Sequence, residues 1–166
     1  CLASPLETLP FRSESFDVTV GKFVMEHVPS PLEVFREFWR VLRPGGVLAI
    51  LTPNRLSLFA FISAAIPHGV KQTIKSWLFK GHEEDTFRTY YRANTRWTLN
   101  RSMCEAGFTR ERVEMLAGMW AFFIFNTPLA LFVRSIERMQ TQVPLLRDCS
   151  THIMGLWRKP IVAGAA

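Results

Sequence analysis

Residues 16–51, FDVTVGKFVMEHVPSPLEVFREFWRVLRPGGVLAIL, decide the fold. They begin with a short β-branched and apolar run, residues 16–20, which predicts a buried strand that ends at Gly21. A second apolar run, residues 47–51, predicts another strand, which ends before Thr52-Pro53-Asn54. Because neither run alternates with polar residues, both are typical of parallel strands that are covered on both faces.

The segment between these strands carries the signals of a helix. Ser30 is the predicted N-cap, Pro31 takes the first helical position, and Glu33 completes a capping box. Pro44-Gly45-Gly46 is expected to end the helix. Apolar residues at helical spacing form one stripe, namely Phe35, Phe38, Trp39 and Leu42. Strand, helix and strand in succession predict a βαβ unit with a right-handed crossover.

The rest of the chain continues the α/β pattern. Thr95 is expected to cap a helix that ends at Gly107, with Cys104 in the core. Strands are predicted over residues 112–117 and 152–158, the latter at the edge of the sheet. A helix from about residue 128 to 140 is predicted to bury one apolar stripe, made of Leu129, Phe132, Val133, Ile136 and Met139.

Composition limits the classes of function. The 166 residues are 48% apolar and 20% charged, which excludes a disordered chain. The net charge of +6 fits an anionic partner, but no nucleic-acid-binding motif accompanies it, so we expect no nucleic acid partner. The three cysteines are far apart in sequence, which favours reduced thiols and a cytoplasmic location.

Two stretches exceed what a small α/β sheet needs. Residues 56–80 are apolar and then basic, and residues 115–133 carry no charge. Because Asn126-Thr127-Pro128 interrupts the second stretch, we expect a helix there instead of a membrane span. The apolar faces, rimmed by basic residues, predict peripheral contact with an anionic membrane. The basic residues are Lys71, Lys75, Lys80, Arg134 and Arg138.

An ordered series of motifs points to a known family. The motifs are Leu9-Pro10-Phe11, Ser15-Phe16-Asp17-Val18, Met25-Glu26-His27-Val28-Pro29, Val41-Leu42-Arg43-Pro44-Gly45-Gly46 and Thr52-Pro53-Asn54. In order and spacing, the series resembles the class I S-adenosylmethionine-dependent methyltransferases, in particular the small-molecule branch that includes ubiquinone- and menaquinone-pathway enzymes. The close resemblance covers residues 9–54, and a looser one extends to residue 160.

The resemblance implies a Rossmann-like sheet with strand order 3-2-1-4-5-7-6, whose last strand is antiparallel. Residues 1–160 would form the C-terminal part of such a domain, with strands 4–7, helical insertions at about 55–90 and 119–150, and a tail at 161–166. The family's Gly-rich cofactor loop has no counterpart in these 166 residues. We therefore expect an N-terminally truncated fragment that is inactive by itself.

The resemblance also assigns cofactor contacts for S-adenosyl-L-methionine. Leu6 would contact the adenine through its backbone, although Pro5 stands where the family has an acidic residue. Gly21, Lys22 and Phe23 would contact the methionine part at the end of a strand, as ligands of open α/β sheets do. Lys22 is a departure, because family members often have a small residue there.

Four further residues are candidates for the chemistry. His27 could accept a proton from the methyl acceptor, or it could only order the loop before the next helix. Asn54, Tyr90 and Tyr91 could contact the acceptor, or they could serve as turn and packing residues. The cluster of His82, Glu83, Glu84 and Asp85 is expected to be solvated, so we predict no metal site.

The predicted function is therefore methyl transfer from S-adenosylmethionine to a small-molecule or lipid-linked acceptor. The protein's part in such a reaction is mainly to align the acceptor with the methyl group and to exclude water. The alternative from another class is a non-enzymatic module that binds lipid at the membrane surface.

Overall fold

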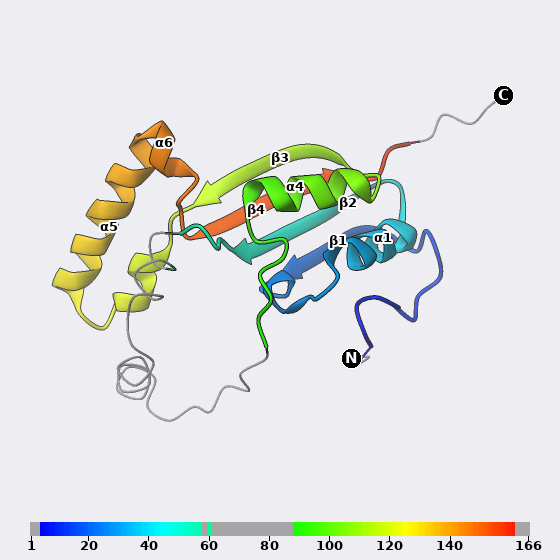
Figure 1. Cartoon of the computed structure of the whole chain (residues 1–166), viewed down its shortest axis with the longest axis horizontal. Helices are drawn as coiled ribbons and strands as arrows, with labels where there is room; N and C mark the ends of the chain where they lie inside the picture. Colours follow the sequence, from blue (N-terminus) through cyan, green and yellow to red (C-terminus); the bar gives the residue numbers. More distant parts are fainter. Residues whose placement is uncertain (1–3, 58–59, 61–87, 162–166) are drawn as a thin grey trace.

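A computed structural model describes residues 4–57, 60 and 88–161 of the chain (Figure 1). Its four strands form one sheet in the order β1-β2-β4-β3. They are β1 (Phe16–Lys22), β2 (Leu42–Pro53), β3 (Thr109–Leu116) and β4 (His152–Arg158). β1 and β2 are parallel, whereas β4 runs antiparallel to both β2 and β3. The predicted α/β class is confirmed.

Helices cover one face of this sheet. α1 (Pro31–Val41) and α4 (Arg96–Glu105) lie side by side on it (Figure 1). A 3-10 turn, η1 (Met25–His27), follows β1. Three further elements lie beyond the edge at which β1 and β2 end (Figure 1). They are the 3-10 helix η2 (Met119–Phe123), α5 (Thr127–Gln142) and α6 (Pro144–Arg147).

The core lies between the sheet and the two covering helices. Leu48, Ile50 and Trp157 point into it from β2 and β4, and Phe35 and Leu99 meet them from α1 and α4. No helix among the described residues covers the other face of the sheet, where Val18 and Val20 of β1 are 57% and 69% exposed. β1 is also an edge strand within the described residues.

The first helix forms where predicted but is capped differently. Ser30 occupies the N-cap position and Pro31 begins the helix, yet the Ser30 side chain makes no capping hydrogen bond. The predicted capping box is therefore wrong. The helix is instead fixed by its buried residues, among them Val34, Phe35 and Phe38, which outweigh the roughly 1 kcal/mol of a cap.

β2 begins earlier than predicted, at Leu42. Phe16 of β1 pairs with Leu42 and Val18 pairs with Val47, so residues 43–46 bulge out of the strand. Gly45 has φ +82, and a Cβ on Gly46 would lie 2.9 Å from the carbonyl oxygen of Arg43. The glycines that were expected only to end the helix therefore also make this bulge possible.

Two placements predicted from the sequence are wrong. β4 is not an edge strand, because it pairs with β2 on one side and with β3 on the other. Its short sequence gives no signal of two partners, since they come from distant segments. Cys104 lies on the exposed side of α4, while Leu99 and Met103 of that helix are buried.

α5 forms as predicted, but only part of the expected stripe is covered. Val133 and Ile136 of this stripe are half-buried, whereas Leu129, Phe132 and Met139 are exposed. The buried residues of the helix are Ala130 and Glu137. The reason is polar: the Glu137 carboxylate accepts hydrogen bonds from the amides of Gly118, Met119 and Trp120, at 3.0, 2.8 and 3.3 Å. The Thr151 hydroxyl donates a fourth, at 2.9 Å. This carboxylate fixes the rotation of α5 against η2.

Candidate functional site

The candidate site lies at the edge where β1 and β2 end. Because β4 is antiparallel, its first residue, His152, lies at the same edge and pairs with Pro53 of β2 and Leu116 of β3. Ligands of open α/β sheets bind outside the carboxyl ends of parallel strands. The expected cofactor contacts at the end of β1 therefore lie at the edge where the topology favours a ligand.

Lys22 and Phe23 present a cation and an aromatic ring at this edge. Both are exposed, and the Lys22 ammonium lies 5.6 Å from the centroid of the Phe23 ring. Phe23 has φ +51, an uncommon value for a non-glycine residue, and its amide donates to the carbonyl of Leu51 at 2.8 Å. Gly21 is buried below them, and a Cβ there would meet the Ile50 side chain at 2.8 Å.

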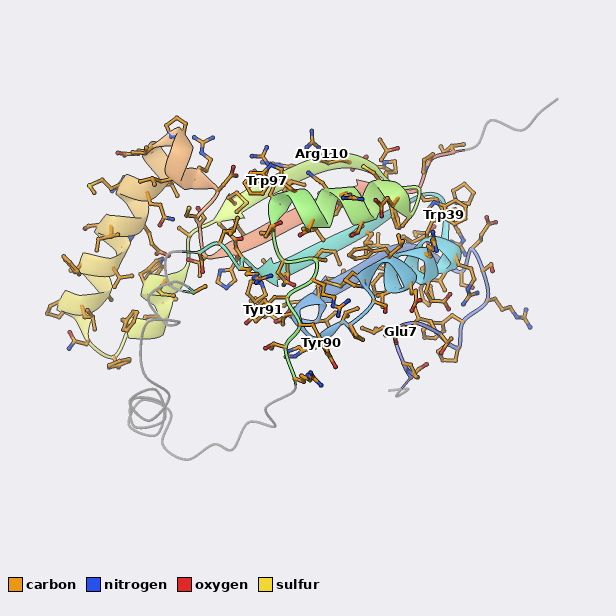
Figure 2. All side chains as sticks on the ribbon, in the orientation of Figure 1. Glu7, Trp39, Tyr90, Tyr91, Trp97 and Arg110 are labelled. Atoms are coloured by element: carbon orange, nitrogen blue, oxygen red, sulfur yellow. The ribbon has the colours of Figure 1, made fainter. Side chains whose placement is uncertain are left out.

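The loop that carries Tyr90 and Tyr91 is held against η1. Their backbone amides both donate to the carbonyl of Glu26, at 2.7 and 3.2 Å, and the His27 Nδ1 lies 3.2 Å from the carbonyl oxygen of Arg88. Figure 2 shows both tyrosines on this segment. Burial, and secondly the Glu26 carboxylate, raise the pKa of Tyr91, so its hydroxyl is a donor at neutral pH.

A buried cluster of polar side chains joins the segments that meet at this edge. Glu26, Thr52 and Asn94 are 6%, 0% and 0% exposed. The Asn94 amide donates to the Thr52 hydroxyl at 2.6 Å and to the carbonyl of Pro53 at 3.2 Å, and the Thr52 hydroxyl donates to Glu26 at 3.4 Å. Sequence reasoning missed Thr52 and Asn94 as a pair, because they are distant in the chain and neither stands in a charged cluster.

Asn54, a candidate acceptor contact, is buried and engaged internally. Its amide nitrogen donates to the carbonyls of Asp148 and Ser150, both at 2.8 Å, and its side-chain oxygen accepts from the Leu56 amide at 3.1 Å. These contacts tie the end of β2 to the segment before β4. The structure thus shows a bracing role, while the contact with an acceptor stays a prediction.

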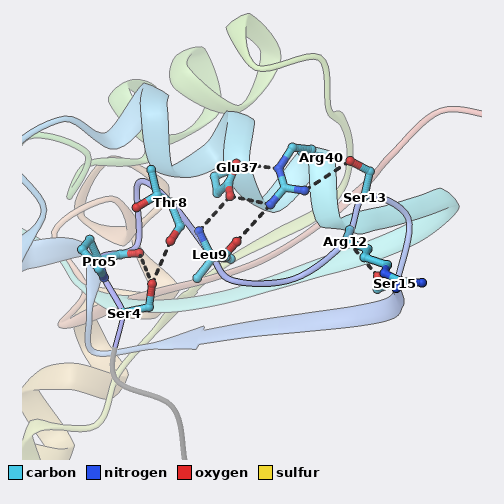
Figure 3. A network of polar contacts seen from close by, with 9 residues as sticks. All are labelled: Ser4, Pro5, Thr8, Leu9, Arg12, Ser13, Ser15, Glu37 and Arg40. Atoms are coloured by element: carbon cyan, nitrogen blue, oxygen red, sulfur yellow. Dashed lines mark hydrogen bonds and ion pairs between the residues drawn. The ribbon is translucent and has the colours of Figure 1, made fainter.

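The segment that carries Leu6 is anchored to α1 (Figure 3). The Leu9 amide donates to Glu37 at 2.8 Å, and Arg40 donates to the Leu9 carbonyl at 3.1 Å and to the Ser13 hydroxyl at 3.2 Å. The hydrogen bond from Arg40 lowers the pKa of Glu37, so the network is charged at neutral pH. The Leu6 side chain packs against the core, which leaves only its backbone for the predicted cofactor contact.

His152 is a site residue that the sequence analysis did not identify. Its ring centroid lies 5.5 Å from that of Phe23, with the planes inclined at 56°. The sequence offered no signal for it, since it was assigned to an edge strand with no stated partner. The other predicted polar cluster, His82 to Asp85, lies outside the described residues.

Comparison with known sequences covers the N-terminal third of the chain. Residues 1–50 match the methyltransferase domain family Methyltransf_11. A probable S-adenosylmethionine-dependent methyltransferase of Mycolicibacterium smegmatis is 44% identical over 52 residues, which are 31% of this chain and 20% of that protein. The demethylmenaquinone methyltransferase of Listeria welshimeri is 52% identical over 48 residues, 28% of this chain and 20% of that protein.

Solved structures extend the similarity to the fold of nearly the whole chain. An S-adenosylmethionine-dependent methyltransferase from Mesorhizobium loti has a TM-score of 0.57 and 19% identity, covering 93% of this chain and 67% of that one. Geranyl diphosphate C-methyltransferase from Streptomyces coelicolor has a TM-score of 0.56 and 14% identity, covering 95% and 52%. The [4+2]-cyclase SpnF has a TM-score of 0.51 and 15% identity, covering 96% and 55%.

These comparisons confirm the resemblance to class I S-adenosylmethionine-dependent methyltransferases, in sequence over residues 1–50 and in fold over most of the chain. The matched stretch spans only a fifth of the two curated relatives. Because a cyclase shares the fold, the fold alone does not fix the reaction, which must be argued from the site.

Proposed function

We propose that the intact protein transfers a methyl group from S-adenosylmethionine to a small-molecule or lipid-linked acceptor at the carboxyl edge of β1 and β2. The observation that carries this proposal is the position of Gly21, Lys22 and Phe23, which come after the family motif of residues 15–18 and lie at the end of β1 and just beyond it. Lys22 offers an exposed cation to the cofactor's carboxylate, and the Phe23 ring offers apolar surface beside it.

When bound, the cofactor supplies a methyl group that its sulfonium already activates. The protein's residues have simpler tasks. Gly21 to Phe23 would hold the methionine part, while Tyr90 and Tyr91, pinned by Glu26, would border the acceptor. His27 is a candidate for the proton acceptor in this proposal, and its contact with the Arg88 carbonyl orients the ring.

The four strands correspond, in this proposal, to strands 4, 5, 7 and 6 of the family sheet. The order β1-β2-β4-β3 and the antiparallel β4 support this assignment. The family's Gly-rich loop is not among the 166 residues, so we expect the isolated chain to be inactive and to bind cofactor far more weakly than the intact protein. Binding of S-adenosylhomocysteine by the intact protein, mapped by hydrogen exchange, tests the proposal; micromolar binding is expected, and no binding would contradict it.

One observation favours a lipid-linked acceptor over a soluble one. From η2 to α6, several large apolar side chains are 38% exposed or more, including Phe125, Phe132 and Met139. The cations of this region are Arg134, Arg138 and Arg147, whereas its one carboxylate, Glu137, is buried. Such a surface suits the interface of an anionic bilayer. None of the described helices is long and apolar enough to cross a membrane.

Vesicle sedimentation tests this membrane contact. The intact protein should co-sediment with phosphatidylglycerol vesicles in low salt and dissociate in 1 M salt, because salt screens the attraction. Phe132→Ser combined with Met139→Ser should reduce binding roughly tenfold, whereas Arg110→Gln, on β3, should not. Equal recovery in the supernatant with and without vesicles would exclude the contact and favour a soluble acceptor.

A further inference from the structure

A second imidazole, that of His152, lies at this edge of the sheet. Its ring has contacts that the sequence analysis did not predict. The ring lies between two elements: Phe23, after β1, at 5.5 Å between centroids, and Gly118, after β3. A Cβ on Gly118 would stand 3.6 Å from Nδ1 and 3.8 Å from Cε1 of His152. The imidazole therefore lies between the Phe23 ring and the backbone of Gly118.

Burial, and not a neighbouring charge, favours the neutral form of this imidazole. Burial lowers the pKa of His152, and the Glu137 carboxylate on α5 opposes this to a smaller extent. Two other charged groups near this edge have partners of their own. The Lys22 ammonium lies over the Phe23 ring, and Glu114 of β3 binds Arg112. The neighbours on β2 and β3, Pro53 and Leu116, are uncharged.

No hydrogen-bond partner of either His152 nitrogen is found in the part of the chain that the structure describes. The two histidines of the edge differ in this respect, because the His27 Nδ1 lies 3.2 Å from the Arg88 carbonyl oxygen. A neutral imidazole with an unengaged nitrogen, beside the residues assigned to the methionine part of the cofactor, is suited to receive a proton from an acceptor bound there.

We propose that His152 contacts the methyl acceptor and takes its proton during transfer. This rests on the proposed function. The acceptor's X–H bond breaks as X bonds to the methyl carbon, the proton passes to the free imidazole nitrogen, and the electron pair of the broken C–S bond stays on sulfur. The imidazolium then releases the proton to solvent. His152 would thus be a catalytic residue in addition to, or in place of, His27.

The first test follows the imidazole itself in the intact protein. Histidine C–H resonances are assigned with His152→Gln and followed by NMR from pH 5 to 8. We expect His152 to titrate below its ordinary pKa of about 6.5 and to titrate lower still in Glu137→Gln, because an opposing carboxylate is removed. Saturating S-adenosylhomocysteine should shift its resonances. The proposal would be overturned if His152 were charged at pH 7, or if its resonances did not shift when S-adenosylhomocysteine binds.

The second test separates catalysis from binding. Methyl-tritiated S-adenosylmethionine is incubated with the intact protein and a deproteinised cell extract as the source of acceptor. His152→Gln should lower the initial rate about 100-fold and leave the Kd for S-adenosylhomocysteine within about threefold. It should also remove the acidic limb of the pH–rate profile. Met154→Leu, two residues along the same strand, is the control and should leave all three unchanged.

The outcomes distinguish the two proposals. If the wild-type protein binds S-adenosylhomocysteine and transfers label, but His152→Gln keeps its rate and its acidic limb, His152 is not the proton acceptor and the methyltransferase proposal stands. If the wild-type protein does not bind S-adenosylhomocysteine, the proposed function fails. If it binds without transferring label, the NMR titration alone decides whether His152 is neutral and lies beside the cofactor.

Discussion

Replacing Gly155 with alanine should lower the free energy of unfolding by about 3 kcal/mol. Gly155 is an interior residue of β4, and a Cβ there would overlap the ring of Trp157, two residues along the same face. Trp157 is fully buried between the sheet and the helices, so its ring has no space into which to move. For a chain of this size, the loss corresponds to a melting temperature lower by roughly 6–12 °C.

A double-mutant cycle makes this prediction specific. In a Trp157→Leu background the ring is gone, so Gly155→Ala should cost less than about 1 kcal/mol. Gly118→Ala is the matched glycine control, because its Cβ would make only ordinary contacts. Chemical denaturation of the intact protein measures the free energy of unfolding of each variant. If Gly155→Ala lowered the free energy of unfolding equally in both backgrounds, overlap with the Trp157 ring would not be the cause.

Replacing Glu137 with alanine should release α5 from η2. Three backbone amides and the Thr151 hydroxyl would lose their acceptor, and buried donors left unpaired cost about 1–3 kcal/mol each unless the segment opens to water. We expect local opening, seen as exchange of the Gly118, Met119 and Trp120 amides that is about 100-fold faster.

Glu137→Gln keeps one carbonyl oxygen and should show a smaller effect, roughly tenfold. Arg138→Ala changes the neighbouring exposed residue and should leave exchange of residues 118–120 unaltered. Hydrogen exchange with mass spectrometry, read over the peptides of η2 and α5, provides the comparison. Unaltered exchange in Glu137→Ala would mean that apolar packing, and not the carboxylate, holds α5.

The sequence predicted those parts of the fold that depend on local signals. β1, α1 and α4 follow from apolar runs and helical spacing, and the Thr95 cap is present with Thr98 as its partner. The interior place of β4 did not follow from local signals and was implied only by the family order, because strand order depends on pairing with segments about 40 and 100 residues away. The bulge at residues 43–46 also escaped prediction, since proline and glycine signal a turn and a bulge alike.

The candidate site was predictable in part, from the resemblance and from the topology of the sheet. Gly21 and Lys22 end a strand and Phe23 follows it, so topology alone places them at the edge. His152 and the cluster of Glu26, Thr52 and Asn94 depend on tertiary packing, for which the sequence has no spacing signal. Glu137 shows the same limit: helical periodicity assigns a carboxylate to solvent, whereas three backbone amides bury it.

Hydrogen exchange of the intact protein with and without saturating S-adenosylhomocysteine tests the central claim most directly. The account predicts binding, with exchange at least about tenfold slower in residues 21–28 and 52–54. Residues 109–111, at the opposite edge of the sheet, should not change. Absence of binding, or protection confined to the opposite edge, would contradict the claim that cofactor and acceptor meet where β1 and β2 end.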